Sequence, residues 1–351
     1  MTRSITDTMP LPRNYPLNCW WVAAFGDEVG REPLARWMLD TPVVLYRTEA
    51  GEAVALEDRC PHRQAPLSSG RIRGDAIECG YHGFQFGSNG RCVRVPSMSA
   101  PAPIKVESYP VREIGPLIWI YLGDMEKIDE VPPPPVIDWA ADPGFNIRKG
   151  WMEIAANYLL LKENVLDLTH LGYVHAESFQ ITDWVNPPVV TTEGDKVTYR
   201  QEFIRSPLAP GYALSLGLEP GTPWNRVGTG TVLSPASHVS TVEFFDPDAP
   251  AVSTGRTCFA HLTTPIDNET MHYFFIAGRN HANDDATMDG LTQILLKGFK
   301  EDQDILEKVQ KMISRKPRRG STGERSVKAD AAGVAARRSI ERWMERETIV
   351  D

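Results

Sequence analysis

The chain has 351 residues, more than a single core of ordinary size requires, and this length predicts about two domains. Its hydrophobic fraction of 42% and charged fraction of 24% are typical of ordinary globular proteins. The formal net charge of −9 argues against a nucleic acid or an anionic membrane surface, because either would favour a basic face. We therefore expect neither among its partners.

Residues 1–21 contain no apolar core of signal-peptide length, and nowhere do about 18 apolar residues follow one another. We therefore expect a cytoplasmic protein. Its five cysteines are too few in a chain of this length to form a disulfide framework, so cysteines close to histidines suggest a metal instead. A basic stretch at residues 314–326 is rich in Gly and Pro and predicts a solvated loop.

The first part of the chain consists of short apolar runs between turn signals. Residues 42–58 predict a β-hairpin, and residues 104–111 and 116–122 predict further strands. Because helical periodicity is largely absent before residue 125, we expect an antiparallel β domain here. Four consecutive prolines at 132–135 then predict an extended connector.

The second part mixes the two patterns. Residues 151–170 have helical spacing, and Gly172 is where such a helix could end. Strand signals recur between residues 189 and 280, and residues 289–314 and 329–347 predict two amphipathic helices. The fold class is therefore α+β, with an antiparallel sheet and helices in the second domain. We place the domain boundaries at 15–125 and 126–351, and expect residues 206–228 to form a pocket entrance or a surface loop.

Two short motifs combine cysteine and histidine: Cys60-x-His62 and Cys79-x-x-His82. Each of two hairpin-like loops would offer one thiolate and one imidazole. This is the Rieske arrangement, in which two cysteines hold one iron and two histidines the other iron of a [2Fe-2S] cluster. The alternative is a structural zinc site, although a zinc ribbon usually pairs its cysteines within one loop.

A second constellation contains His170 and His175, with Gly172 allowing a turn that lets both imidazoles converge. Two histidines and one carboxylate form the facial triad of non-haem Fe(II). The carboxylate should come from the late helix, where Asp302 is the first choice and Asp304 the fallback. A histidine pair taken alone is more often a core or surface feature, but the cluster motif upstream favours ligands.

Together these motifs resemble the Rieske non-haem iron oxygenases, within the monooxygenase branch that includes the vanillate and dicamba O-demethylase oxygenase components. The resemblance covers nearly the whole chain and extends to residues 18–24, NCWWVAA, and 272–280, HYFFIAGRN. It implies an N-terminal all-β Rieske [2Fe-2S] domain followed by a catalytic domain of the helix-grip (START-like) type. It also implies a Rieske cluster, a mononuclear Fe(II) and dioxygen as co-substrate.

The resemblance also implies roles for individual residues. Those that would hold the cluster are Cys60, His62, Cys79 and His82, and those that would hold the mononuclear iron are His170, His175 and Asp302. Asp167, expected on one helix face with His170, would bridge to a cluster histidine of a neighbouring subunit; otherwise it is an exposed acid paired with a lysine. Asn164 would lie near the iron or serve as a helix-packing amide. His261 would contact substrate or be a buried strand histidine.

The activity implied is that of a terminal oxygenase component, which hydroxylates or O-demethylates a small aromatic substrate resembling a methoxybenzoate. Electrons would come from an NAD(P)H-dependent reductase, a ferredoxin or both, because this sequence has no G-x-G-x-x-G dinucleotide motif. The family's head-to-tail contacts imply a homotrimer. Two alternatives are a ring-hydroxylating dioxygenase component and a Rieske electron-transfer protein whose second domain binds a ligand without oxygen chemistry.

Overall fold

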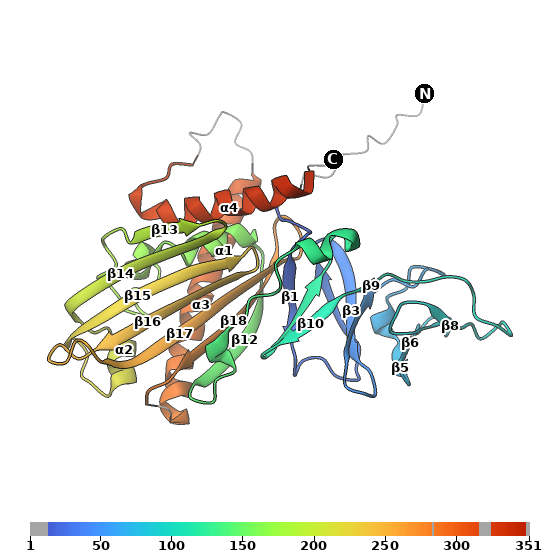
Figure 1. Ribbon diagram of the computed structural model, residues 1–351, viewed down its shortest axis with the longest axis horizontal. Coiled ribbons are helices and arrows are strands. Elements are labelled where there is room, and N and C mark those ends of the chain that lie inside the picture. Colours follow the sequence, from blue (N-terminus) through green and yellow to red (C-terminus); the bar gives the residue numbers. More distant parts are fainter. Residues whose placement is uncertain (1–12, 283, 316–323, 349–351) are drawn as a thin grey trace.

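The computed structural model describes residues 13–282, 284–315 and 324–348, so most of the basic stretch predicted as a loop lies outside the described residues. An N-terminal region of small sheets lies beside a C-terminal region built on one large sheet (Figure 1). This arrangement confirms the α+β class and the N-terminal all-β domain. None of the described helices is long and apolar enough to cross a bilayer.

The N-terminal region contains one three-stranded and two four-stranded antiparallel sheets within the described residues. Its strands are β1 (Trp20–Phe25), β2 (Leu34–Met38), β3 (Thr41–Arg47), β4 (Ala53–Glu57), β5 (Arg71–Arg73), β6 (Ala76–Glu78), β7 (Gln85–Phe86), β8 (Cys92–Arg94), β9 (Ser108–Tyr109), β10 (Val111–Ile114) and β11 (Leu117–Tyr121). The predicted hairpin is confirmed as β3 and β4. The strand predicted over residues 104–111 is shorter than expected and is interrupted at Pro110, which has no N–H to give to a ladder.

The C-terminal region is a seven-stranded antiparallel sheet in the order β12-β18-β17-β16-β15-β14-β13. Its strands are β12 (Asn146–Ile154), β13 (Val189–Glu193), β14 (Lys196–Pro207), β15 (Pro223–Ser234), β16 (Ser237–Phe245), β17 (Ser253–Pro265) and β18 (Met271–Arg279). The helices are α1 (Tyr158–Asn164), α2 (Pro210–Leu216), α3 (Asp285–Ser314) and α4 (Ala331–Thr348). The long α3 crosses one face of this sheet (Figure 1). Its Phe299 ring lies 4.9 Å from that of Phe275 on β18.

Alternate residues of β17 and β18 share the sheet face that α3 covers, because side chains alternate along a strand. The register places three cross-strand pairs on this face: Thr257 opposite Arg279, Phe259 opposite Ala277 and His261 opposite Phe275. These residues therefore line any cavity that lies between the sheet and α3.

The helix predicted over residues 151–170 is wrong at both ends. The first residues complete β12, which pairs with β18 up to Ile154, so sheet pairing overrides the helical periodicity. Helix α1 begins after Asn157, whose side chain accepts a hydrogen bond from the Leu159 N–H. It ends at Asn164, and Asp167 then caps a separate 3-10 turn, η4 (Leu168–Gly172).

The N-terminal and C-terminal regions are packed together through one hydrophobic core. The Phe25 ring of β1 meets the Phe274 ring of β18 edge-on at 5.6 Å. Beside them, the Thr264 hydroxyl donates a hydrogen bond to the Val22 carbonyl at 2.7 Å. This packing fixes the position of the N-terminal region against the large sheet.

Candidate metal centres and active-site cavity

The two loops that carry the Cys and His motifs are built in the same way. The N–H of Cys60 in one loop and that of Cys79 in the other each donate a hydrogen bond of 2.8 Å to the carbonyl of the residue five positions later. The cysteine carbonyl then accepts from the residue four ahead, Gln64 or Gly83, and both of these have left-handed backbones with φ of 60° and 70°. Two equivalent turns therefore present one thiol and one imidazole each.

The four side chains are arranged with sulfur inside and imidazole outside. Cys60 and Cys79 are buried, whereas His62 and His82 are exposed and their rings lie 4.6 Å apart. Burial, together with the neighbouring Cys79 thiol, raises the pKa of Cys60 to about 11, so a metal that binds these thiols must displace their protons. Two inner thiolates and two outer imidazoles are the donor set of a Rieske cluster.

The second candidate centre lies between α1, η4 and α3. His170, His175 and Asp302 each offer one ligand atom, and these atoms all lie within 4.8 Å of one another. The Asp302 Oδ1 atom is 3.2 Å from His175 Nε2 and 3.6 Å from His170 Nε2. His175 Nε2 is buried and has no hydrogen-bond partner in the part of the chain that the structure describes, which is the environment expected of a metal-binding nitrogen. Two imidazoles and a carboxylate suit a non-haem Fe(II).

Hydrogen bonds fix the tautomers of both imidazoles. His170 Nδ1 lies 2.6 Å from the Asp167 carbonyl, and His175 Nδ1 lies 2.9 Å from a carboxylate oxygen of Glu301. Because these oxygens only accept hydrogen bonds, both Nδ1 atoms carry hydrogen and both Nε2 lone pairs are directed to the centre. Glu301 was not predicted, although its position immediately before Asp302 was a usable signal.

The carboxylate that faces the histidines is Asp302 and not Asp304. Asp302 is 6% exposed, and its Oδ1 accepts a hydrogen bond from Asn164 Nδ2 at 3.0 Å. Asp304 is half exposed and pairs with Lys300 at 3.1 Å on the outer side of α3. Asn164 therefore positions the Asp302 carboxylate by direct contact. The sequence predicted only that Asn164 would lie near the iron or pack as a helix amide, and did not predict this contact.

Asp167 meets His170 through its backbone and not through its carboxylate. Its Oδ1 accepts from the N–H and the hydroxyl of Thr169, at 3.0 and 2.7 Å, which closes the cap of η4. The expected common helix face with His170 is wrong, because α1 has already ended. Among the described residues, none donates a hydrogen bond to the second carboxylate oxygen, Oδ2.

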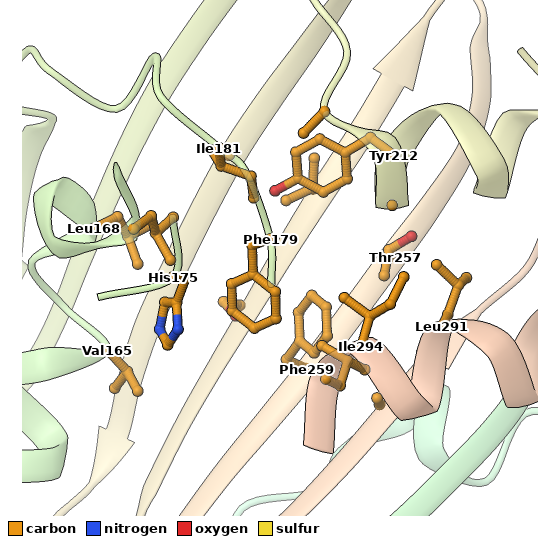
Figure 2. Close-up of a pocket in the computed structure, with 18 of the residues that line it drawn as sticks. Val165, Leu168, His175, Phe179, Ile181, Tyr212, Thr257, Phe259, Leu291 and Ile294 are labelled. Atoms are coloured by element: carbon orange, nitrogen blue, oxygen red, sulfur yellow. The ribbon is translucent and has the colours of Figure 1, made fainter. Parts of the chain in front are cut away.

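A cavity of about 160 Å³ opens from this centre along the sheet face under α3. Figure 2 shows His175 at one end and Thr257 and Leu291 at the other, with Phe179, Phe259 and Ile294 between them. Residues of the predicted pocket segment 206–228, including those of α2, form part of its wall. An apolar cavity of about 150 Å³ is large enough to bind benzene, so a space of this size suits a small aromatic molecule.

His261 lines this cavity, and its hydrogen bond among the described residues is to a side chain and not to the backbone. Its Nδ1 shares a hydrogen bond of 2.7 Å with the Tyr273 hydroxyl. Burial lowers the pKa of His261 to about 4, although the Asp302 charge opposes this shift, so the imidazole is neutral at pH 7. A neutral imidazole on a cavity wall can donate a hydrogen bond to a bound molecule or accept one from it.

Comparisons with known proteins identify the family. The vanillate O-demethylase oxygenase C-terminal domain matches residues 154–346, and the Rieske [2Fe-2S] domain matches residues 19–110. The chain belongs to the Rieske non-haem iron monooxygenases. Its cofactors are therefore a Rieske [2Fe-2S] cluster and a mononuclear non-haem iron, and dioxygen is its co-substrate. This confirms the resemblance seen in the sequence.

Several characterised members of this family are similar over their whole length. The dicamba O-demethylase oxygenase component of Stenotrophomonas maltophilia is 32% identical, over 94% of this chain and 98% of the relative. The iron-sulfur subunit of the toluene-4-sulfonate monooxygenase system of Comamonas testosteroni is also 32% identical, over 94% and 97%. Dicamba monooxygenase bound to 3,6-dichlorosalicylic acid has a TM-score of 0.85 at 28% identity, over 95% and 99% of the two chains. This Rieske monooxygenase is thus the oxygenase component of a multicomponent system.

Proposed function

We propose that the two centres are held by the residues described above. Cys60, His62, Cys79 and His82 are the proposed ligands of the Rieske cluster, and His170, His175 and Asp302 those of the mononuclear iron. The single observation that carries this proposal is the convergence of three ligand atoms within 4.8 Å, two of them on buried residues, at the end of a mostly apolar cavity. A facial triad leaves positions open on the side where dioxygen and substrate must meet.

The proposed substrate is a small aromatic compound with an alkyl or methoxy group. The size and apolar lining of the cavity support this class, and the relatives are named for dicamba, vanillate and toluene-4-sulfonate. An aryl methyl ether would react with one dioxygen, two electrons and two protons, and the products would be a phenol, formaldehyde and water. His261 is the proposed polar contact of the substrate close to the iron.

The protein's own groups prepare this reaction. Glu301 and the Asp167 carbonyl hold the two imidazoles, and Asn164 holds the Asp302 carboxylate, so the ligands need little rearrangement when a metal binds. Aromatic and aliphatic side chains exclude water from the cavity, which protects a reactive oxidant. The iron, when bound, supplies activation of dioxygen and attack on the C–H bond.

Electrons should reach the cluster from a separate NAD(P)H-dependent reductase, with or without a ferredoxin. We propose a head-to-tail homotrimer in which Asp167 links the mononuclear centre to a cluster histidine of the next subunit. Two observations support this: His62 and His82 are exposed, and the Asp167 Oδ2 has no hydrogen-bond donor among the described residues.

The proposed domains, 15–125 and 126–351, divide the chain between β11 and β12.

The test is a coupled assay with a surrogate reductase and a panel of methoxybenzoates, in which oxygen uptake and formaldehyde are measured together. O-demethylation predicts formaldehyde in proportion to the oxygen consumed in coupled turnover, and no formaldehyde from the Asp302→Ala variant. Ring-hydroxylated products without formaldehyde, from every substrate that is turned over, would contradict the demethylase proposal.

A further inference from the structure

Arg279 is a buried cation on the wall of the active-site cavity. It is the last residue of β18 and lies on the sheet face that α3 covers, in the same alternation as Phe275. Its side chain has no exposed surface and lines the cavity. Among the described cavity-lining residues, it is the single lysine or arginine.

The guanidinium of Arg279 is only partly satisfied by the protein. Its Nη2 donates to the Asp284 carbonyl at 3.1 Å, and the half-exposed Asp284 carboxylate lies 3.8 Å away. Its Nε and Nη1 atoms are buried and have no hydrogen-bond partner among the described residues. Unsatisfied donors on a buried cation are costly, so a bound acceptor at this position would be strongly favoured.

Thr257 supplies a second unsatisfied group at the same place. It is the residue directly opposite Arg279 across β17 and β18, and its hydroxyl is buried without a hydrogen-bond partner within residues 13–282, 284–315 and 324–348. Figure 2 shows its side chain among the cavity-lining residues near Leu291, at the end opposite His175. Two neighbouring strands thus place three polar atoms that have no hydrogen-bond partner among the described residues at one end of a mostly apolar cavity.

This polar end is well separated from the metal-binding residues. Thr257 precedes His261 by four residues on β17, which corresponds to about 13 Å along an extended strand. On α3, the cavity-lining residues run from Met288 to Asp302, or about 21 Å along the helix axis. A molecule that reaches both ends must therefore be more extended than a benzoate, whose carboxylate is attached directly to the ring.

We propose that Arg279 and Thr257 bind a carboxylate of the substrate, at the opposite end of the cavity from the iron ligands. This inference rests on the proposed function and specifies its substrate class: an extended aromatic acid whose oxidised alkyl group and carboxylate lie at opposite ends. A carboxylate suits the site because guanidinium groups bind it through paired, charge-assisted hydrogen bonds. It also neutralises the one buried cation that the cavity presents.

The experiment measures the binding of 4-methoxycinnamate and of its neutral amide to the iron-loaded holoenzyme by anaerobic calorimetry. The variants are Arg279→Met and Thr257→Val, and the control is Arg226→Met. Arg226 is an equally buried arginine that does not line the cavity and pairs with Asp183. An unchanged Rieske visible spectrum together with an unchanged far-UV circular dichroism spectrum and unfolding midpoint shows that each variant is folded, and Thr257→Val provides a smaller change if Arg279→Met does not fold.

The wild-type protein should prefer the acid to the amide. Arg279→Met should reduce this preference about 10- to 100-fold and Thr257→Val about 2- to 10-fold, with the ratio unchanged in Arg226→Met. Equal acid-to-amide ratios in the wild type and both cavity variants would overturn the inference, even if formaldehyde is formed. Conversely, a preference that depends on Arg279, without formaldehyde from either probe, would leave the binding site standing and count against the demethylase proposal alone.

Discussion

The Nδ1 atom of His175 lies 2.9 Å from a carboxylate oxygen of Glu301, and the Ser178 hydroxyl donates to the same oxygen at 2.5 Å. Glu301 precedes Asp302 on α3, so adjacent residues of one helix serve the two sides of the same imidazole. One carboxylate orients the ring through Nδ1 and the other faces its Nε2 at 3.2 Å. This links the rigidity of α3 to the geometry of the proposed iron site.

Replacing Glu301 with Gln should weaken iron binding at the mononuclear site about 10- to 100-fold, because outer carboxylates orient the ligating imidazole and increase its basicity. Iron retained after dialysis against a weak chelator measures this effect. Asp304→Asn is the matched control, since Asp304 lies on the same helix and faces away from the site. Equal iron retention in the two variants would show that Glu301 does not support the ligand.

The choice between the two candidate carboxylates gives a second prediction. Asp302→Ala should abolish substrate oxidation and mononuclear iron binding while leaving the Rieske spectrum intact, because the two centres are built from separate segments. Asp304→Ala should retain both activity and iron. Substrate oxidation by the Asp302→Ala variant would exclude Asp302 as a required ligand, and loss of iron from Asp304→Ala would move the assignment there.

Gly298 gives a prediction opposite to that of helix propensity. A Cβ at this position of α3 would lie 2.2 Å from Phe179, whose ring is 4.4 Å from that of His175. Gly298→Ala should therefore destabilise the protein and reduce its iron content. In contrast, a Cβ at Gly290 on the same helix meets nothing within 4 Å, so Gly290→Ala should raise the free energy of unfolding by up to about 1 kcal/mol. Urea unfolding of both variants checks this, and similar stabilisation of the two would be contrary to the structure.

The sequence supported predictions wherever the signal was local. Cysteine and histidine spacing, strand alternation and the histidine pair all belong to short segments. The start of α1 was misplaced because β12 takes up the first residues of the predicted helix through pairing with distant β18. The proximity of Arg279 to Thr257 could not be predicted from the sequence, because it depends on the register in which β17 pairs with β18. Glu301 stood next to the predicted ligand Asp302 in the sequence, but its contact with His175 follows only from the way α3 packs.

Lys162 is a buried lysine on α1, with 2% of its surface exposed. Burial lowers its pKa from the usual value near 10.5 to about 8. Below pH 8 the folded protein must therefore hold a buried charge, at a cost of about 3 kcal/mol, and this cost decreases as pH rises from 8 to 10.5.

Lys162→Met should consequently stabilise the protein at pH 7, and the gain should fall to less than half by pH 9.5. The midpoint of urea unfolding at the two pH values measures the difference. A gain that is the same at both pH values, or a loss at pH 7, would show that the buried amine does not destabilise the fold in this way.

The measurement that tests the two-centre assignment most directly is the iron and acid-labile sulfide content of the anaerobically purified protein, combined with an EPR spectrum after dithionite reduction. The ligand sets predict about three irons and two sulfides per chain, with a Rieske-type signal. About two irons and two sulfides would contradict the mononuclear site, and zinc without sulfide would contradict the cluster site as well.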